Sequence, residues 1–189
     1  MTELLRSIRA VAFDLDGTLI DSAPDIQHAL NAAFKKAGLA RFDLDLVRAW
    51  IGDGPDVLIA RALTHAGLND ADAELRLRLR RWFDVDTLAA PLSLGSVYPG
   101  IAELVAALRP HVPMVVVTNK PTPLSRAVLD AAGLLPFVDG VFGGDTPALR
   151  KPAPDLLLAA AAQLEVAATQ LLMVGDSVLD LRAAQAAGY

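Results

Sequence analysis

The chain has 189 residues, a formal net charge of −5 and no cysteine, and 53% of its residues are hydrophobic. This length accommodates one sizeable core with a small additional unit, and the hydrophobic content excludes a disordered chain. The negative balance argues against a nucleic-acid partner, because a phosphate backbone requires a basic surface. The absence of cysteine excludes disulfides, thiolate-bound metals and a cysteine nucleophile.

The N-terminal segment and the distribution of apolar residues bear on location. Charged residues interrupt the apolar ones in residues 1–9, which is not typical of a signal peptide. No stretch approaches the ~18 continuous apolar residues that a membrane span needs. We therefore expect a cytoplasmic protein that binds neither membranes nor nucleic acid.

The first predicted elements are a strand and a helix. Residues 10–13 form an apolar run of strand length. Apolar residues then recur at helical spacing between residues 26 and 37, which predicts a helix. Ser22, with Asp25 three residues later, resembles a capping box that would start this helix.

Residues 43 to about 90 are predicted to be entirely helical, in three helices. The first covers residues 43–50, and a glycine-rich turn at residues 51–55, which we call the glycine turn, leads into the second. The third contains the sequence RLRLRR at residues 76–81, which we interpret as a solvated helix face rather than an anion site. Residues 91–100 have the composition of a linker.

Strands and helices alternate again after residue 100. Apolar runs predict buried strands within residues 113–119 and 171–176 and a short strand within 137–145, with helices between them. Short apolar strands joined by helices indicate a mostly parallel sheet covered on both faces. The predicted fold class is α/β: a doubly wound, Rossmann-like parallel sheet with a helical unit inserted after the first strand.

Polar residues stand at the carboxyl end of each predicted strand, where open α/β sheets bind ligands. Asp14 and Asp16 share one side, because successive strand residues point to opposite faces. Two adjacent carboxylates repel each other unless a cation or proton lies between them, and Asp176 can add a third carboxylate. Such an oxygen cluster suits a hard cation, above all Mg²⁺. Helix capping is the simpler interpretation and is favoured for Asp145, whereas Asp176 can both cap and ligate.

This arrangement suits phosphoryl chemistry. One carboxylate can attack phosphorus to form an acyl phosphate, and its neighbour can carry the leaving-group proton. Thr118, together with backbone N–H groups at a helix start, can hold the phosphoryl oxygens. Lys151, which precedes Pro152 on a stiff turn, is the candidate cation.

Four segments resemble, in order, the motifs of the haloacid dehalogenase superfamily of phosphatases. They are DLDGTLIDS (14–22), VVVTN (115–119), KPAP (151–154) and VGDSVLD (174–180). The segments WIGDGPDVLIARAL, TNKPTP, GGD and KPAPDLLL are, within that superfamily, most similar to the bacterial phosphoglycolate phosphatases. The resemblance implies a Mg²⁺-dependent phosphatase with a helical cap domain.

The resemblance also implies roles for residues at these motifs. Asp14 would be the nucleophile and a Mg²⁺ ligand. Asp16 would be the general acid and base, and would bind Mg²⁺ through its backbone carbonyl. Asp176 would complete the ligands of the metal, while Thr118 and Lys151 would hold the phosphoryl group.

Further roles follow around this group. Asp180 would support Lys151 or the metal from behind. Asn119 is expected to contact the substrate, as are Gly52 and Gly54 in a cap loop that closes over it.

The resemblance further divides the chain into two parts. The α/β core would comprise residues 1–20 and 96–189, and the helical cap residues 21–95. The family pattern continues, beside the last strand, with at least one more strand and helix, which this sequence does not contain. We therefore expect the strand in residues 171–174 to have an unpaired edge.

The predicted function is hydrolysis of a small phosphorylated metabolite. The resemblance implies that this metabolite is 2-phosphoglycolate. We expect the protein to act as a monomer or homodimer. The nearest alternative is another capped member of the superfamily, a sugar phosphatase or a β-phosphoglucomutase. The loop around Asp53 would determine which of these activities the protein has. A receiver-like signalling domain is an alternative of a different class, as is an inactive relative used as a binding module. The general acid at Asp16 and the helical insert favour an enzyme that turns over its substrate rather than a receiver domain, which keeps its phosphate for longer.

Overall fold

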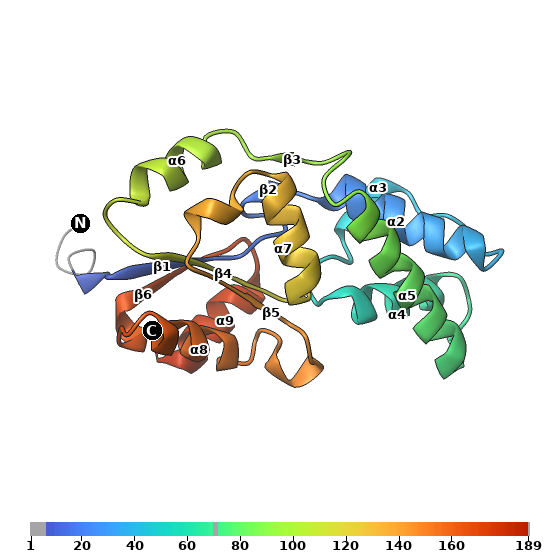
Figure 1. The fold of residues 1–189 in the computed structure, drawn as a ribbon. Coiled ribbons are helices and arrows are strands. Elements are labelled where there is room, and N and C mark those ends of the chain that lie inside the picture. Colours follow the sequence, from blue (N-terminus) through green and yellow to red (C-terminus); the bar gives the residue numbers. More distant parts are fainter. Residues whose placement is uncertain (1–6, 70–71, 189) are drawn as a thin grey trace.

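The fold is built on a four-stranded parallel sheet with helices on both faces, in a computed structural model that describes residues 7–69 and 72–188 (Figure 1). The sheet has the order β5-β4-β1-β6. Its strands are β1 (Ala10–Phe13), β4 (Met114–Thr118), β5 (Gly140–Gly143) and β6 (Leu171–Val174). The doubly wound α/β prediction is confirmed.

Two pairs of helices cover the sheet. On one face lie α6 (Ile101–Leu108) and α7 (Thr122–Ala131), and on the other α8 (Asp155–Gln163) and α9 (Val178–Ala187) (Figure 1). Short 3₁₀ turns complete the connections at Leu135–Phe137, Pro147–Leu149 and Ala168–Gln170.

The central strands are apolar throughout because both of their faces are buried. Val11 and Val116 pack on the face covered by α6 and α7, whereas Ala12 and Val117 pack against α8 and α9. A continuous apolar run is therefore the expected sequence of such a strand. Among the described strands, β6 pairs with β1 alone, so the expected unpaired edge at residues 171–174 is confirmed there.

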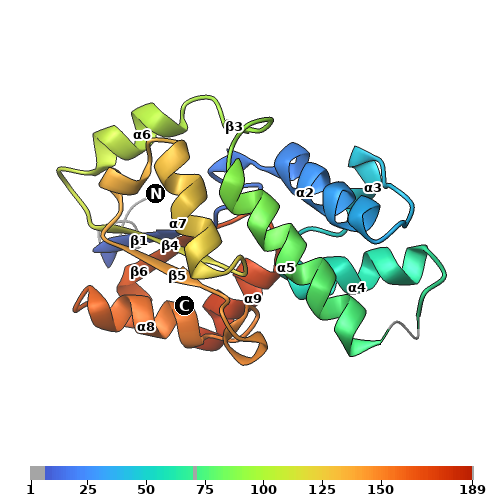
Figure 2. The same cartoon turned by 45° about the vertical axis from the view of Figure 1, so that its right-hand side comes forward.

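A second hydrophobic core belongs to the four described helices between β2 (Ile20–Asp21) and β3 (Ser96–Val97), which we call the helical unit. They are α2 (Ala23–Lys36), α3 (Leu44–Arg48), α4 (Pro55–His65) and α5 (Ala73–Ala89). Figure 2 shows them together at one end of the molecule, beside the sheet. Leu30, Phe34 and Leu63 are fully buried in this core.

None of the described helices, in the helical unit or beside the sheet, is long and apolar enough to cross a membrane.

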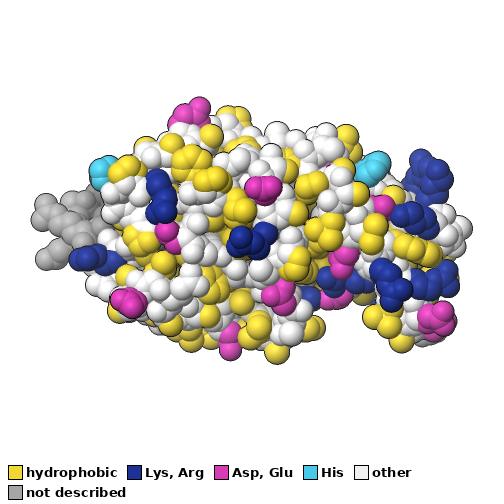
Figure 3. Space-filling view, in the orientation of Figure 1, with side chains coloured by type: hydrophobic (Ala, Val, Ile, Leu, Met, Phe, Trp, Pro, Cys, Tyr) yellow, Lys and Arg dark blue, Asp and Glu magenta, His cyan; other side chains and the backbone are white. Residues whose placement is uncertain are grey.

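Figure 3 shows Lys and Arg side chains gathered over the helical unit. Arg78 and Arg81 are exposed, in line with the interpretation of residues 76–81 as a solvated face. Arg80 departs from it, because its guanidinium is half-buried and pairs with Asp56 and Asp84. That the helical unit forms a cap domain bounded by residues 21 and 95 stays a prediction.

Two short strands join the helical unit to the sheet. β2 (Ile20–Asp21) and β3 (Ser96–Val97) pair antiparallel, which the sequence did not predict. Asp25, at the start of α2, accepts hydrogen bonds from the backbone N–H groups of residues 93–95 at 2.7 to 2.9 Å. The carboxylate therefore joins the two chain segments that connect the sheet with the helical unit, which we call the crossings.

The capping box predicted at Ser22 and Asp25 is wrong. Ser22 makes no side-chain cap hydrogen bond to the helix, and its hydroxyl donates to Asp16 Oδ1 instead. Asp25 is occupied by the linker that precedes β3. Both side chains could cap a helix, but Ser22 bonds to Asp16, outside the helix, and Asp25 bonds to residues 93–95, which are distant in the sequence.

Asp25→Asn should destabilise the protein. The amide offers one acceptor oxygen where three backbone donors now meet a charged carboxylate, so we expect a loss of about 1–3 kcal/mol in the free energy of unfolding. Urea denaturation measures it, with Asp45→Asn on the exposed surface of α3 as the matched control. Equal changes in the two variants would contradict a clamp at residues 93–95.

Candidate active site

The predicted site residues meet at the carboxyl ends of the strands, where the sheet faces the helical unit (Figures 1 and 2). The ladder between β1 and β6 continues one residue beyond β1, because the Asp14 N–H donates to the carbonyl of Val174 at 2.9 Å. This brings the loop after β1 beside the loop after β6. Asp14 and Asp176 therefore approach each other from loops 162 residues apart, as the strand-end argument predicted.

Asp14 is a buried carboxylate with a defined set of partners. Its Oδ1 accepts from the Leu15 N–H at 2.7 Å and lies 3.0 Å from the Lys151 ammonium. Burial raises the pKa of Asp14 from 3.8 to about 6; the Lys151 ammonium opposes that rise, and the charge of Asp180 adds to it. The group is therefore held in an environment that disfavours its charged form until a further cation is near.

Lys151 is the buried cation of the site, with 3% of the residue exposed. Its Nζ donates to Asp180 Oδ1 at 2.5 Å and to the Val117 carbonyl at 3.0 Å, in addition to its contact with Asp14. Asp180 is fixed in turn by Ser177, whose N–H and hydroxyl donate to Oδ2. The structure thus brings Asp180 into contact with Lys151, and its supporting role stays a prediction.

Three carboxylates form a cluster at the same place. Oxygen atoms of Asp14, Asp176 and Asp180 all lie within 4.8 Å of one another. Asp176 approaches closely because Gly17 has no side chain; a Cβ there would collide with the Asp176 carboxylate. Thr18 supports Asp176 from the other side, its hydroxyl lying 3.1 Å from Oδ1. An all-oxygen donor set of this kind fits Mg²⁺.

Asp16 lies at the same cavity as Asp14, but its carboxylate has different partners. Lys120 Nζ donates to both oxygens, at 2.7 and 2.9 Å, and the Ser22 hydroxyl donates to Oδ1 at 2.5 Å. Lys120 is 6% exposed and had no role predicted from the sequence. The available signal was its position at the mouth of β4, directly after Thr118 and Asn119.

Thr118 and Asn119 are both buried at the end of β4. Thr118 lines the cavity with Asp14. The Asn119 amide donates to the carbonyls of Gly52 and Lys151, at 2.9 and 3.0 Å, and its Oδ1 accepts from the Lys151 N–H at 2.7 Å. Both ends of this side chain are thus engaged with protein groups; its expected contact with substrate stays a prediction.

The glycine turn lies over this group. Gly52 and Gly54 have φ angles of 125° and 87°, which favour glycine. A Cβ on Gly54 would lie 2.9 Å from the Asn119 carbonyl oxygen, whereas a Cβ on Gly52 would meet nothing within 4 Å. The turn therefore needs glycine for its backbone, and at residue 54 for close approach as well.

Asp145 does not stand at a helix N-cap, so the capping interpretation favoured from the sequence is wrong: the N-cap residues are Pro121 for α7 and Thr146 for the 3₁₀ turn at Pro147–Leu149. The Asp145 carboxylate accepts from the N–H and hydroxyl of Thr122 at 2.7 and 2.8 Å, at the first residue of α7. The residue is exposed. It therefore fixes the start of a helix that follows the site.

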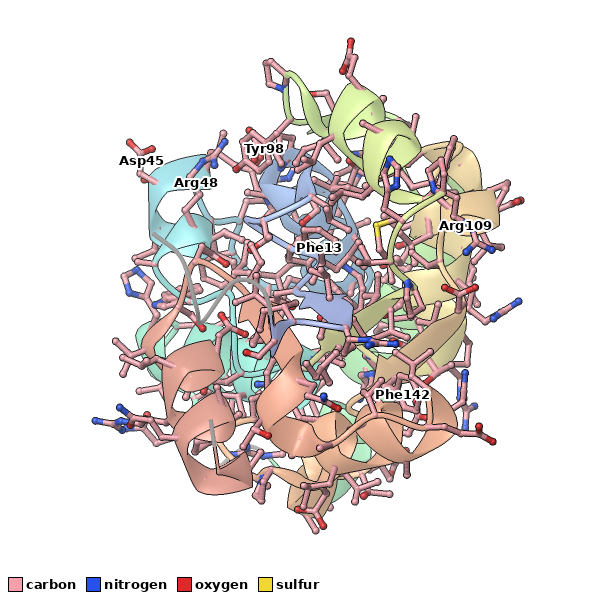
Figure 4. The ribbon with its side chains drawn as sticks, turned by 90° about the vertical axis from the view of Figure 1, so that its left-hand side faces the viewer. Phe13, Asp45, Arg48, Tyr98, Arg109 and Phe142 are labelled. Atoms are coloured by element: carbon pink, nitrogen blue, oxygen red, sulfur yellow. The ribbon has the colours of Figure 1, made fainter. Side chains whose placement is uncertain are left out.

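Two cavities open beside Asp14 and Asp16. One has polar walls from the sheet and apolar walls from the helical unit, such as Leu58 and Phe83. The other is bordered by Asp176, Arg48 and Tyr98. Figure 4 shows Arg48 beside Tyr98, and Arg48 pairs with Asp21 at 2.9 Å. The site therefore lies between sheet and helical unit.

A sequence model of the haloacid dehalogenase-like hydrolases matches residues 8–188. The chain belongs to this hydrolase family. The motif resemblance is thereby confirmed, and with it the prediction that the protein is an enzyme.

Individual relatives show which members of this family the chain is similar to. The chain is 40% identical, over 97% of its length and 79% of the relative, to a protein named phosphoglycolate phosphatase from Yersinia pseudotuberculosis serotype I (strain IP32953). A crystal structure described as a predicted phosphoglycolate phosphatase from Haemophilus somnus 129PT is 32% identical, with a TM-score of 0.89 over 96% of this chain and 83% of that one.

A third relative carries a different name. CbbY from Rhodobacter sphaeroides, crystallised with phosphate, is 29% identical, with a TM-score of 0.82 over 96% of this chain and 83% of that one. A mutant of CbbY was crystallised with xylulose-(1,5)bisphosphate.

Asp14→Asn should stabilise the metal-free protein at neutral pH. A carboxyl with a higher pKa in the folded than in the unfolded chain loses stability as the pH rises from about 4 to about 6. Removing the charge should therefore raise the free energy of unfolding by on the order of 2 kcal/mol above that window. Urea denaturation in excess chelator measures this, and the gain should shrink towards pH ~4. A variant less stable than wild type at both ends of the range would contradict it.

Proposed function

We propose that this hydrolase is a Mg²⁺-dependent phosphatase that transfers the phosphoryl group of a small phosphate monoester to Asp14 and then to water. The observation that carries the proposal is the buried Asp14 carboxylate, which faces Lys151 and joins Asp176 in one oxygen cluster. Such a site combines a nucleophile, a cation for phosphoryl oxygens and donors for a hard metal.

In the first half of the reaction, Asp14 attacks phosphorus. Its contacts with Leu15 and Lys151 both fall on Oδ1, which leaves Oδ2 for the new bond to phosphorus. Lys151 and Thr118 hold the phosphoryl oxygens. Asp16 donates its proton to the ester oxygen as the bond from phosphorus to that oxygen breaks, and the alcohol leaves.

In the second half, water attacks the phosphorus of the aspartyl phosphate. Asp16 takes the proton of that water, the bond between phosphorus and Asp14 breaks, and inorganic phosphate leaves. Lys120 and Ser22 keep the Asp16 carboxylate pointed at the cavity through both halves.

Asp14 and Asp176, with the backbone carbonyl of Asp16, would hold Mg²⁺. When bound, the metal neutralises the carboxylates and withdraws charge from the phosphoryl oxygens. Asp180 lies in the same cluster, but its oxygens are committed to Lys151 and Ser177, so its role is to hold those groups in place.

The substrate is proposed to be 2-phosphoglycolate. The support is the name shared by the relatives of similar sequence and fold. Gly52 and Gly54 would bring backbone groups of the glycine turn close to a compact ester. CbbY favours a second candidate, a sugar phosphate, because its crystal structures hold phosphate and a sugar bisphosphate.

A phosphate-release screen tests the proposed function. We expect 2-phosphoglycolate to be hydrolysed fastest in a panel that includes sugar phosphates and p-nitrophenyl phosphate, with activity lost after chelation and restored by Mg²⁺. Asp14→Asn is the control for contaminating phosphatase and should abolish release. Release that survives exhaustive chelation would exclude the metal-dependent mechanism, and a preference for sugar phosphates would select the second candidate.

Asp16→Asn should reveal the general acid through its dependence on the leaving group. For an alkyl ester such as 2-phosphoglycolate, loss of the acid should lower kcat/KM, which reports the steps up to departure of the alcohol and not the later attack of water, by ~10²–10⁴. For p-nitrophenyl phosphate the loss should be much smaller, because nitrophenolate leaves without a proton. The comparison is made at saturating Mg²⁺, and equal losses on both esters would remove Asp16 from the acid role.

A further inference from the structure

The glycine turn and the residue after it are attached to the sheet at two points. Asn119 donates to the Gly52 carbonyl at 2.9 Å, and Arg150 donates to Asp56 Oδ2 at 2.5 Å. Asn119 follows Thr118 in the sequence, and Arg150 precedes Lys151. Each proposed phosphoryl-binding residue therefore has a sequence neighbour that grips the helical unit.

The Arg150 side chain is largely shielded from water, and only a few protein groups bind its charge instead. The residue is 8% exposed, its Nε donates to the Gly144 carbonyl at 3.0 Å, and its terminal nitrogen reaches Asp56. Asp56 is thus the carboxylate that pairs with this buried guanidinium. A buried charge that loses such a partner is strongly destabilising, so the ion pair and the local backbone conformation depend on each other.

Asp56 is held firmly in its turn. Burial by itself raises the pKa of this carboxyl, but hydrogen bonds from Arg150 and Arg80 outweigh that effect and hold the pKa below its usual value. Arg80 also donates to Asp84 at 2.8 Å on α5. A continuous ionic network therefore runs from α5, through the first turn of α4, to the segment that carries Lys151.

Close packing accompanies these bonds. A Cβ on Gly54 would lie 2.9 Å from the Asn119 carbonyl oxygen and 3.2 Å from Arg150 Nε. Asn119 in turn brackets the backbone of Lys151, accepting from its N–H and donating to its carbonyl. The turn, Asn119, Arg150 and the Lys151 backbone are therefore one contact network.

We propose that Arg150 is a positioning residue that couples closure of the helical unit over the site to the placement of Lys151. With the unit closed, Asp56 holds Arg150 and the adjoining backbone, and Lys151 points at Asp14. With the unit open, Arg150 loses its carboxylate and the segment carrying Lys151 loses this restraint. The kinetic part of this inference rests on the proposed phosphatase function, whereas the coupling itself does not.

Hydrogen–deuterium exchange tests the coupling without any substrate. Asp56→Asn removes the charge on the helical unit, and we expect amide exchange in residues 147–154 of the core to rise about tenfold, in line with the loss of a charge-assisted hydrogen bond. Arg150→Gln should raise exchange reciprocally in residues 51–58.

Arg109→Gln is the matched control. Arg109 pairs with Asp139 at 3.0 Å, at the amino end of β5, and Figure 4 shows it on the side of the molecule away from Arg48 of the helical unit. This variant should leave exchange in both segments unchanged. Exchange that rises only in the segment carrying each mutation, or equally in the control, would overturn the coupling.

A double-mutant cycle supplies the kinetic test. Asp56→Asn and Arg150→Gln should each lower kcat about tenfold on the preferred ester with little change in KM. The double variant should lose clearly less than the two single losses combined, because both changes break the pair between Arg150 and Asp56, although Asp56→Asn also removes a partner of Arg80. Arg150→Lys should recover part of the loss, since it keeps the charge but not the fork that also reaches Gly144.

The outcomes separate the two proposals. If the wild type releases phosphate from no ester while exchange still rises across the interface, the phosphatase proposal fails and the coupling stands. If the wild type is active and the single variants keep kcat within twofold, or the double variant shows additive losses, Arg150 does not position Lys151.

Discussion

The site depends on the burial of one ammonium group between two carboxylates. Lys151 can remain charged inside the protein because Asp14 and Asp180 face it, at 3.0 and 2.5 Å. Asp14 follows β1 and Asp180 belongs to α9, so this charge compensation joins the first and last parts of the described chain. An unpaired buried charge costs several kcal/mol, so Lys151 needs a carboxylate partner to stay charged inside the protein, and Asp180 is the nearer of the two.

The helical unit is joined to the sheet on two sides with different chemistry. At the crossings, β2 pairs with β3 and the Asp25 carboxylate gathers three backbone N–H groups. Over the site, the Asn119 amide donates a hydrogen bond, Arg150 makes an ion pair, and Leu124 of α7 packs into the core of the helical unit. The crossings involve more backbone hydrogen bonds than the contacts over the site. That difference suits a unit that is anchored at one edge and released at the other.

The sequence by itself determined the fold class and the positions of the strand-end carboxylates. Apolar runs of strand length alternate with segments of helical spacing, and these are local patterns that any neighbouring structure must respect. Asp14, Thr118 and Asp176 could be identified for the same reason, because a residue that follows a buried strand lies at the sheet edge whatever its partners are.

Only the tertiary structure decided which side chains meet. Ser22 and Asp25 have the spacing of a capping box, yet their partners are Asp16 and residues 93–95. Lys120 reaches a carboxylate 104 residues away, and Arg150 one that is 94 residues away. Hydrogen bonds and ion pairs between such distant positions leave no periodic signal in the sequence, because they depend on how the loops and helices pack and not on local conformation.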